Sequence, residues 1–217
     1  SNGESMSRED ILNYTVEDIW TELLARMKDD PFVFASSLLI SSGNKGIVPF
    51  RRVMASFQSE TFRAISPSLI AVQRGEMPPI KRFWIERTKK SGKDTDLAIC
   101  LLWLMAFSER PILVQVSAAN RDQARIIEDR AREILFYNSW LNEFVEIVQS
   151  YIRSRKYSKE IRVKIEATGS AGATQGPTPD VLVLNELVHV EKWSVNEAHM
   201  NNAEGVPRGI VIISTNA

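Results

Sequence analysis

In the first part of the chain, apolar residues recur at the spacing of helices. Between Val16 and Met27 they occupy positions 16, 19, 20, 23, 24 and 27, which places them on one helical face. The Ser66-Pro67 and Pro78-Pro79 pairs interrupt the pattern further along. We therefore expect residues 1–79 to form a helical N-terminal subdomain or lid, with helices at 16–27, 32–40 and 49–65 and a loop at 41–46.

From residue 80 onward, short apolar runs alternate with longer helical stretches. Strands separated by helices indicate parallel pairing with right-handed crossovers. The continuous apolar run from Val181 to Leu184 is typical of a central strand buried on both faces. Asn120 is a good N-cap for the helix that follows it. The pattern predicts an α/β core over residues 80–217, with strands at 82–87, 111–117, 180–186 and 209–214, helices at 93–107, 120–137 and 195–203, and a two-stranded excursion at 143–151 and 161–166.

The turn after the strand at 82–87 has the chemistry of a phosphate-binding loop. Its sequence is Thr88-Lys-Lys-Ser-Gly-Lys-Asp-Thr95. Backbone N–H groups at the open end of a helix bind phosphate together with a flexible cation, and Ser91, Gly92 and Lys93 provide both. The usual loop has glycine six residues before the lysine and Ser or Thr directly after it, whereas this chain has Arg87 and Asp94 there.

Two later strands end in polar residues that suit the same site. The central strand ends in Asn185-Glu186, and a nucleotide hydrolase needs a metal-binding acid and a water-polarising carboxylate at such a position. Glu186 fits the second role. The last strand ends in Ser214-Thr215-Asn216, which can sense a γ-phosphate and transmit its loss to a moving segment. Either element alone is also explained by an ordinary strand end, but the phosphate loop upstream favours a nucleotide site.

Charge excludes a general attraction to nucleic acid. The 217 residues are 44% hydrophobic and 25% charged, with a formal net charge of zero. Any contact with DNA must therefore come from a local basic face. The segment 149–164 offers one, although a solvated hairpin has the same composition, so both interpretations stand. The basic residues that we single out are Arg153, Arg155, Lys156 and Lys159.

The single cysteine, Cys100, lies in an apolar run at 97–107. We expect it to be a buried core residue in a reducing compartment. The run is well short of the roughly 20 residues that cross a bilayer, so we expect no membrane association.

The combination resembles the ATPase half of the large terminase subunit, the motor that packages DNA into the heads of tailed phages. The resemblance runs from about Phe32 to the end and is carried by the segments 85–93, 115–125, 172–180 with 185–189, and 214–216. It implies a RecA-like P-loop fold of the ASCE class, with ATP and Mg²⁺ as ligands. The family's nuclease half has no counterpart in this sequence, so we expect no nuclease activity.

The resemblance also implies roles for individual residues. Lys93 would hold the β- and γ-phosphates, Glu186 would activate water, and residues 214–216 would couple hydrolysis to DNA movement. Gln58 resembles the family's adenine-reading glutamine, although a solvated helix residue explains it equally well. The family's catalytic arginine lies four residues before the loop lysine, where this chain has Lys89, and Arg87 is the alternative cation. The implied nucleotide contacts are Gln58, Lys89, Lys90, Ser91, Gly92, Lys93, Asp94 and Thr95.

Two departures from the family pattern concern the metal. Asp94 stands where Ser or Thr is usual, and Asn185 stands where the first acid of an Asp-Glu pair is usual. One acid is gained and one is lost, so Asp94 can restore the charge that Asn185 lacks. In the alternative, Thr95 supplies a hydroxyl and hydrolysis is slow or absent. The candidate metal ligands are Asp94, Thr95, Asn185 and Glu186.

These inferences predict an ATP-hydrolysing motor domain that moves double-stranded DNA into a prohead, in the cytoplasm of a bacterial host. The partners implied by the resemblance are DNA, a portal protein and a small terminase subunit. The chain is expected to be a monomer alone and to form a homo-oligomeric ring when assembled. Two other functions stay open: a nucleotide-gated DNA-binding or assembly module with weak or no hydrolysis, and another P-loop motor such as a helicase.

Overall fold

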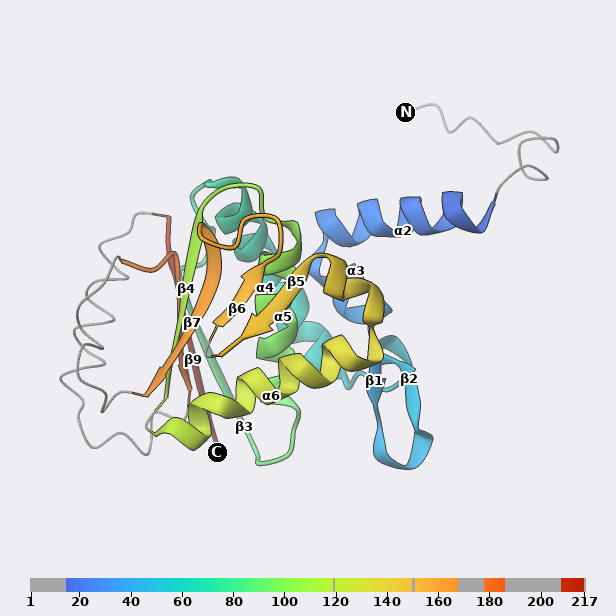
Figure 1. The fold of residues 1–217 in the computed structure, drawn as a ribbon. Coiled ribbons are helices and arrows are strands. Elements are labelled where there is room, and N and C mark those ends of the chain that lie inside the picture. The colour runs from blue at the N-terminus through green and yellow to red at the C-terminus, as the bar shows by residue number, and fades with distance from the viewer. Residues whose placement is uncertain (1–14, 119, 150, 168–177, 186–207, 217) are drawn as a thin grey trace.

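A mainly parallel β-sheet forms one layer of the described structure, and the helices pack on one side of it (Figure 1). The computed structural model describes residues 15–118, 120–149, 151–167, 178–185 and 208–216. Its longer helices are α2 (Val16–Asp29), α3 (Pro31–Ser37), α4 (Ser56–Arg74), α5 (Lys93–Phe107) and α6 (Arg121–Tyr137). Within these described ranges, no helix has the length and apolar character needed to cross a membrane.

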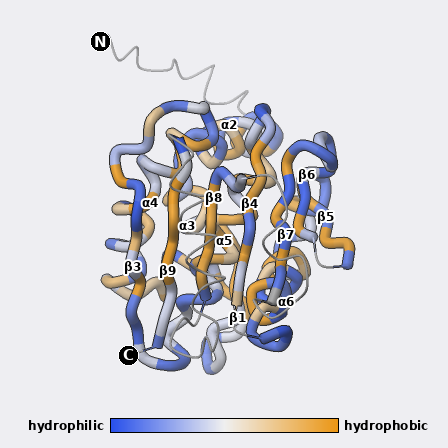
Figure 2. The backbone as a smooth tube through the Cα atoms, turned by 90° about the vertical axis from the view of Figure 1, so that its left-hand side faces the viewer, coloured by the Kyte–Doolittle hydropathy of each residue, from blue (hydrophilic) through white to orange (hydrophobic). Residues whose placement is uncertain are grey.

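Seven strands form the sheet in the order β3-β9-β8-β4-β7-β6-β5, which Figure 2 shows face on. The first five strands in this order, β3, β9, β8, β4 and β7, pair in parallel. Strands β6 and β5 continue the sheet as antiparallel strands. The predicted α/β class with a mainly parallel sheet is therefore confirmed. The strands are β3 (Arg82–Arg87), β4 (Ile112–Ala118), β5 (Val145–Val148), β6 (Tyr151–Ser154), β7 (Ile161–Ala167), β8 (Val181–Asn185) and β9 (Ile210–Asn216).

The order of three of these strands determines where the site lies. Strand β9 is inserted between β3, which leads into the phosphate loop, and β8, which ends at Asn185. This is the RecA-like arrangement that the resemblance implies. Strand β8 is buried on both faces, as its continuous apolar run predicted: Val181 and Val183 belong to the main core, while Leu182 and Leu184 form a second cluster with residues of β9.

Helix α5 is the centre of the main core. It is apolar around most of its circumference, and Trp103 is fully buried with its indole N–H donating to the Met27 carbonyl oxygen at 2.8 Å. Cys100 is buried in the same helix, as predicted. Because neighbours surround α5 on all sides, its N-terminal turn, which carries the phosphate loop, is held at a fixed place above the sheet.

The N-terminal part differs in detail from the sequence prediction. The predicted helix at 49–65 is wrong in its bounds, since α4 begins at Ser56 and continues through Pro67 to Arg74. Burial of Phe62, Ile65, Leu69 and Val72 on both sides of Pro67 outweighs the roughly 3 kcal/mol that an internal proline costs. The predicted helix at 32–40 ends at Ser37, and the predicted loop at 41–46 lies within a hairpin of β1 (Leu39–Ser41) and β2 (Ile47–Pro49).

Apolar residues of α3 and α4 belong to the same hydrophobic core as α5 and the sheet. The subdomain boundary near residue 79 is therefore not a break in packing, and it stays a prediction. The predicted excursion at 143–151 and 161–166 is also wrong in part. Its first strand is two strands, β5 and β6, and β7 is a member of the parallel sheet beside β4. The predicted helix at 195–203 lies outside the described residues.

Candidate nucleotide-binding site

The phosphate loop adopts a conformation that only a few residue types accept without strain. Strand β3 ends at Arg87, helix α5 begins at Lys93, and Gly92 between them has φ +81°. A Cβ atom on Gly92 would also lie 2.9 Å from the amide nitrogen of Gln58. Glycine is therefore favoured here by the backbone angle, and a Cβ would in addition push against the end of the Gln58 side chain. Lys90 has φ +65°, an unusual value for a side-chain-bearing residue.

Two of the four predicted metal-site residues, Asp94 and Asn185, are in contact. The Asn185 side-chain nitrogen donates to Asp94 Oδ1 at 3.3 Å, and Lys93 Nζ lies 3.4 Å from the same oxygen. Lys93 and Asn185 are almost fully buried, with exposed fractions of 5% and 1%, while Asp94 is half-buried. Residues 93 and 185 are thus brought together at the carboxyl ends of β3 and β8, with Asp94 bridging them.

The strand ends around Asn185 present further buried polar atoms. In the sheet, Asn185 lies between Ala118 of β4 and Ser214 of β9. The Asn185 Oδ1 atom and the Ser214 hydroxyl are buried and lack a hydrogen-bond partner among the described residues. The Ser91 hydroxyl in the loop is also buried and lacks a hydrogen-bond partner among the described residues. Buried oxygen atoms of this kind need a partner, and they fit a site whose ligand is a hydrated cation with phosphate oxygens.

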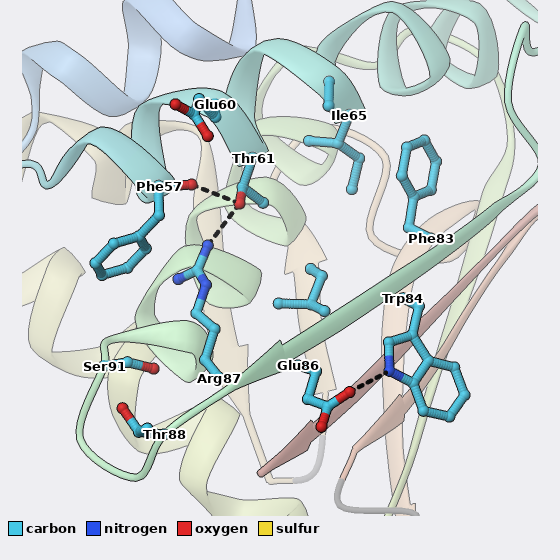
Figure 3. A pocket seen from close by; sticks show the side chains of 12 residues that line it. Phe57, Glu60, Thr61, Ile65, Phe83, Trp84, Glu86, Arg87, Thr88 and Ser91 are labelled. Carbon is cyan, nitrogen blue, oxygen red and sulfur yellow. Dashed lines mark hydrogen bonds between the residues drawn. The ribbon is translucent and has the colours of Figure 1, made fainter. Parts of the chain in front are cut away.

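Arg87 points beneath the loop into a buried ion pair. Its Nη1 donates to Asp96 Oδ2 at 2.6 Å, and its Nη2 donates to the Thr61 hydroxyl of α4 at 2.7 Å (Figure 3). The guanidinium also lies 4.8 Å from the centre of the Phe57 ring. Arg87 is therefore engaged on the α4 side of the loop, whereas Lys89 is exposed. Of the two cations that the sequence left open, the structure leaves Lys89 accessible to a ligand.

Asp96 is a site residue that sequence reasoning missed. Burial raises the pKa of its carboxyl to about 6, although hydrogen bonds from Arg87 and Gln58 favour the ionised form. The available signal was an acid in the first turn of a helix that is otherwise almost entirely apolar, directly before the run Leu97-Ala98-Ile99. A charge at such a position requires a partner, and the sequence does not name one.

Gln58 lies under the loop and beside a cavity. It is buried, its Nε2 donates to Asp96 Oδ1 at 2.9 Å, and its Oε1 accepts from the Ala55 N–H at 3.1 Å. The alternative that Gln58 is a solvated helix residue is therefore wrong. The cavity has a volume of about 280 Å³ and is lined by Gln58, loop residues 90–92, Thr95, and apolar residues that include Phe50, Val53, Ile134 and Tyr137. A flat apolar group attached to a phosphate chain fits such a cavity.

A second cavity, of about 560 Å³, lies on the other side of the loop between α4 and β3 (Figure 3). It is lined by Phe57, Thr61, Phe83, Trp84 and Arg87, among others. Trp84 on the edge strand β3 is 62% exposed, and its indole N–H donates to Glu86 at 3.3 Å.

Two of the four basic residues proposed for DNA contact pair with one acid. Arg153 and Arg155 both pair with Glu146, at 2.8 and 3.5 Å. Lys156 lies 4.9 Å from the Tyr157 ring centre, and Lys159 is exposed. This pairing engages two of the four residues, and the DNA role of this segment stays a prediction.

Of the remaining predicted residues, Ser214 and Thr215 are buried and Asn216 is half-buried at the end of β9. Ser214 pairs in register with Ile85 and Asn185, which places it between the strands that carry the loop and the metal-site amide. Glu186 lies outside the described residues, and so its role stays a prediction.

No protein-family profile matches the chain, and no curated protein matches its sequence. Among solved structures, the large terminase of bacteriophage HK97 aligns over 87% of this chain with a TM-score of 0.67 and 18% identity. The chain shares the fold of phage large terminases.

A large terminase from a thermophilic bacteriophage aligns over 68% of the chain, with a TM-score of 0.53 and 9% identity. The chain spans 37% of the length of the HK97 terminase and 38% of the length of the thermophilic phage's terminase. At these identities the likeness is one of fold.

Proposed function

We propose that this chain is the ATP-hydrolysing domain of a DNA-packaging motor of the large-terminase kind. The observation that carries the proposal is the direct contact of Lys93, Asp94 and Asn185 at the carboxyl ends of β3 and β8, on a fold shared with large terminases. Ligands of open α/β sheets bind at this edge. The loop, the buried lysine and the adjoining carboxylate are the groups that a magnesium-bound triphosphate requires.

In this proposal, the N–H groups of the loop and Lys93 would bind the phosphates. Asp94, Asn185 Oδ1 and Thr95 would hold Mg²⁺, which supplies positive charge beside the phosphate oxygens. The cavity next to Gln58 would take the base. Exposed Lys89 would place a cation near the transferred phosphate, and Glu186 would orient water. Ser214, Thr215 and Asn216, beside Asn185 in the sheet, would transmit phosphate release.

The test is nucleotide binding and hydrolysis by the chain, compared with Lys93→Ala and Lys89→Ala. We expect Lys93→Ala to weaken ATP binding strongly, because it removes the buried cation at the loop. Lys89→Ala should lower kcat more than it weakens binding. The matched control is Lys45→Ala, which removes an exposed lysine in the β1–β2 hairpin. ATP binding that is unchanged in Lys93→Ala would refute the proposed site.

The contact between Asp94 and Lys93 favours a second candidate function. A carboxylate 3.4 Å from the lysine amine competes with phosphate for the same cation. In that case the chain would be a nucleotide-gated DNA-binding or assembly module with weak or no hydrolysis. Tight ATP binding without turnover, insensitive to added DNA, would support the module. Turnover that DNA stimulates would support the motor, and strand separation on a forked duplex would instead indicate a helicase.

The motor proposal includes partners beyond the nucleotide. They are double-stranded DNA, a portal protein, a small terminase subunit and further copies of the chain in a ring, in the cytoplasm of a bacterial host. Co-sedimentation with proheads that carry a portal, with and without ATP, tests this assembly. A ring that forms only with ATP and portal is the expected result.

A further inference from the structure

We propose that Arg87, Asp96 and Gln58 form a clasp beneath the phosphate loop, and that Gln58 positions this loop instead of reading the nucleobase. The inference rests on the proposed function, because it concerns how the same site is held in place. It departs from the role that the resemblance implies for Gln58. Three observations support this inference.

The first is the arrangement of Asp96, whose two carboxylate oxygens have different partners. Oδ2 accepts from Arg87 Nη1 at 2.6 Å, and Oδ1 accepts from Gln58 Nε2 at 2.9 Å. Arg87 is the last residue before the loop, and Asp96 lies in the first turn after it. Their ion pair therefore joins the two ends of the loop directly and fixes its span.

The second is the orientation of the Gln58 amide. A glutamine recognises the edge of adenine with both of its groups, the oxygen accepting from the amino group and the nitrogen donating to the ring. In this protein the oxygen faces the Ala55 N–H and the nitrogen faces Asp96. Both groups thus have partners inside the protein, on opposite sides of the amide, and turning it toward a base would break these contacts.

The third is the conformation of the loop above the clasp. Lys90 at φ +65° is in a region that costs a residue with a side chain on the order of 1–3 kcal/mol, and such a conformation persists only where surrounding contacts hold it. The Gln58 amide lies directly against Gly92, where it leaves no room for a Cβ. The clasp is itself fixed to α4, because Arg87 donates to the Thr61 hydroxyl, which donates to the Phe57 carbonyl (Figure 3). The loop is therefore kept open in advance for phosphate, so that binding does not have to order it.

Binding of ATP, GTP and inorganic tripolyphosphate, each with Mg²⁺, separates positioning from base reading. Tripolyphosphate has no base, so a base-reading residue cannot affect it. We expect Gln58→Ala to weaken all three ligands by a similar factor, about threefold to tenfold, which corresponds to the hydrogen bond that it donates to Asp96. The ratio of ATP to GTP affinity should stay within about twofold. A loss confined to ATP, with tripolyphosphate unchanged, would overturn the proposal.

The matched control is Gln73→Ala. Gln73 lies on the same helix and donates to the Phe107 carbonyl at 3.1 Å, far from the loop. The rescue variant combines Gln58→Glu with Asp96→Asn, which reverses the direction of the hydrogen bond and keeps acceptors for Ala55 and Arg87. It should recover tripolyphosphate binding relative to Asp96→Asn alone. Failure of the double variant to recover, with its fold intact, would also count against the clasp.

A second readout does not depend on any ligand. Lys89 and Lys90 are exposed in the loop, so trypsin reports how often the loop opens. Cleavage there, identified by the masses of the fragments, should be about threefold to tenfold faster in Gln58→Ala and Asp96→Asn than in the wild type or Gln73→Ala. A wild type that binds neither ATP nor tripolyphosphate would refute the proposed function, while equal cleavage of all four proteins would refute the clasp.

Discussion

Substitutions at positions 94 and 185, singly and together, should show that the two residues form one coupled metal site. Asp94 Oδ1 lies 3.3 Å from the Asn185 side-chain nitrogen, so the two side chains are already in contact. The Asn185→Asp variant would put two carboxylates about 4 Å apart. At an effective dielectric constant of about 20, this repulsion is about 4 kcal/mol, which Lys93 beside the same oxygen offsets in part. We expect Asn185→Asp alone to lower stability without Mg²⁺ and to bind the cation unproductively.

The Asp94→Ser variant should have the opposite defect. It leaves neither position with a charge for the cation, and so magnesium-dependent use of ATP should fall. The double variant restores the hydroxyl and the acid that the resemblance to terminases implies, and it should be more active than the product of the single effects. A coupling free energy of about 0.5–3 kcal/mol corresponds to a factor of about 2 to 150 in rate.

The assay is steady-state ATP hydrolysis by the four proteins over a series of Mg²⁺ concentrations, analysed as a double-mutant cycle in kcat/KM. Asp129→Ser, which removes an exposed acid from α6, is the control for a simple loss of charge. Thermal unfolding without nucleotide measures the repulsion independently of catalysis. Additive rate effects, or a double variant no better than Asp94→Ser, would show that Asp94 does not serve the metal.

Three single residues give further predictions. Glu186→Gln should abolish hydrolysis and leave ATP binding nearly intact, because an amide cannot polarise water as a carboxylate does; equal turnover in an ATPase assay would remove Glu186 from this role. The folded-state pKa of Asp96 is about 6 against an ordinary 3.8, so the folded protein binds a proton on this carboxyl more tightly than the unfolded chain does. The resulting stabilisation is present below about pH 4 and is lost as pH rises through 6. Urea unfolding at pH 4 and 7 should show this component, up to roughly 3 kcal/mol, in the wild type and not in Asp96→Asn, and identical pH dependence of the two would contradict it. Pro67→Ala, at an exposed position inside α4, should raise the free energy of unfolding by about 1–3 kcal/mol by restoring a helical N–H donor, and no gain in urea unfolding would mean that the helix has adapted to the proline.

The elements that the sequence predicted well are those with local signals at both ends. Helix α6 has an N-cap in Asn120, whose side chain accepts from the Gln123 N–H at 2.9 Å, and its apolar stripe continues to Tyr137. Helix α5 is bounded by Gly92 and by Ser108. The bounds of α4 were missed because Pro67 is a strong local signal for a break, and only burial of the helix on both sides of it overrides that signal.

The candidate site also has one part that the sequence predicted and another part that it did not. The loop residues 91–93 are contiguous, and so their common location could be inferred from spacing alone. The partners of Arg87 and Asp96 could not be inferred in this way. Thr61 is 26 residues from Arg87 in sequence, and Gln58 is 38 residues from Asp96. Such pairs are determined by how α4 packs on α5, which a single sequence does not specify.

The contact between positions 94 and 185 joins these two kinds of inference. The sequence shows only that one acid is gained at position 94 and one is lost at position 185. The two changes compensate each other physically only if both residues face the same point in space. The structure places them 3.3 Å apart across 91 residues of chain, at the edge of the sheet where nucleotides bind in open α/β folds. A small cation responds to the total charge around it more than to which strand supplies the carboxylate. An acid on the first turn of α5 can therefore replace one at the end of β8, provided that Lys93 beside it binds phosphate in preference to Asp94. In the proposed function, the competition between phosphate and carboxylate for this one lysine would separate a motor from a nucleotide-gated module.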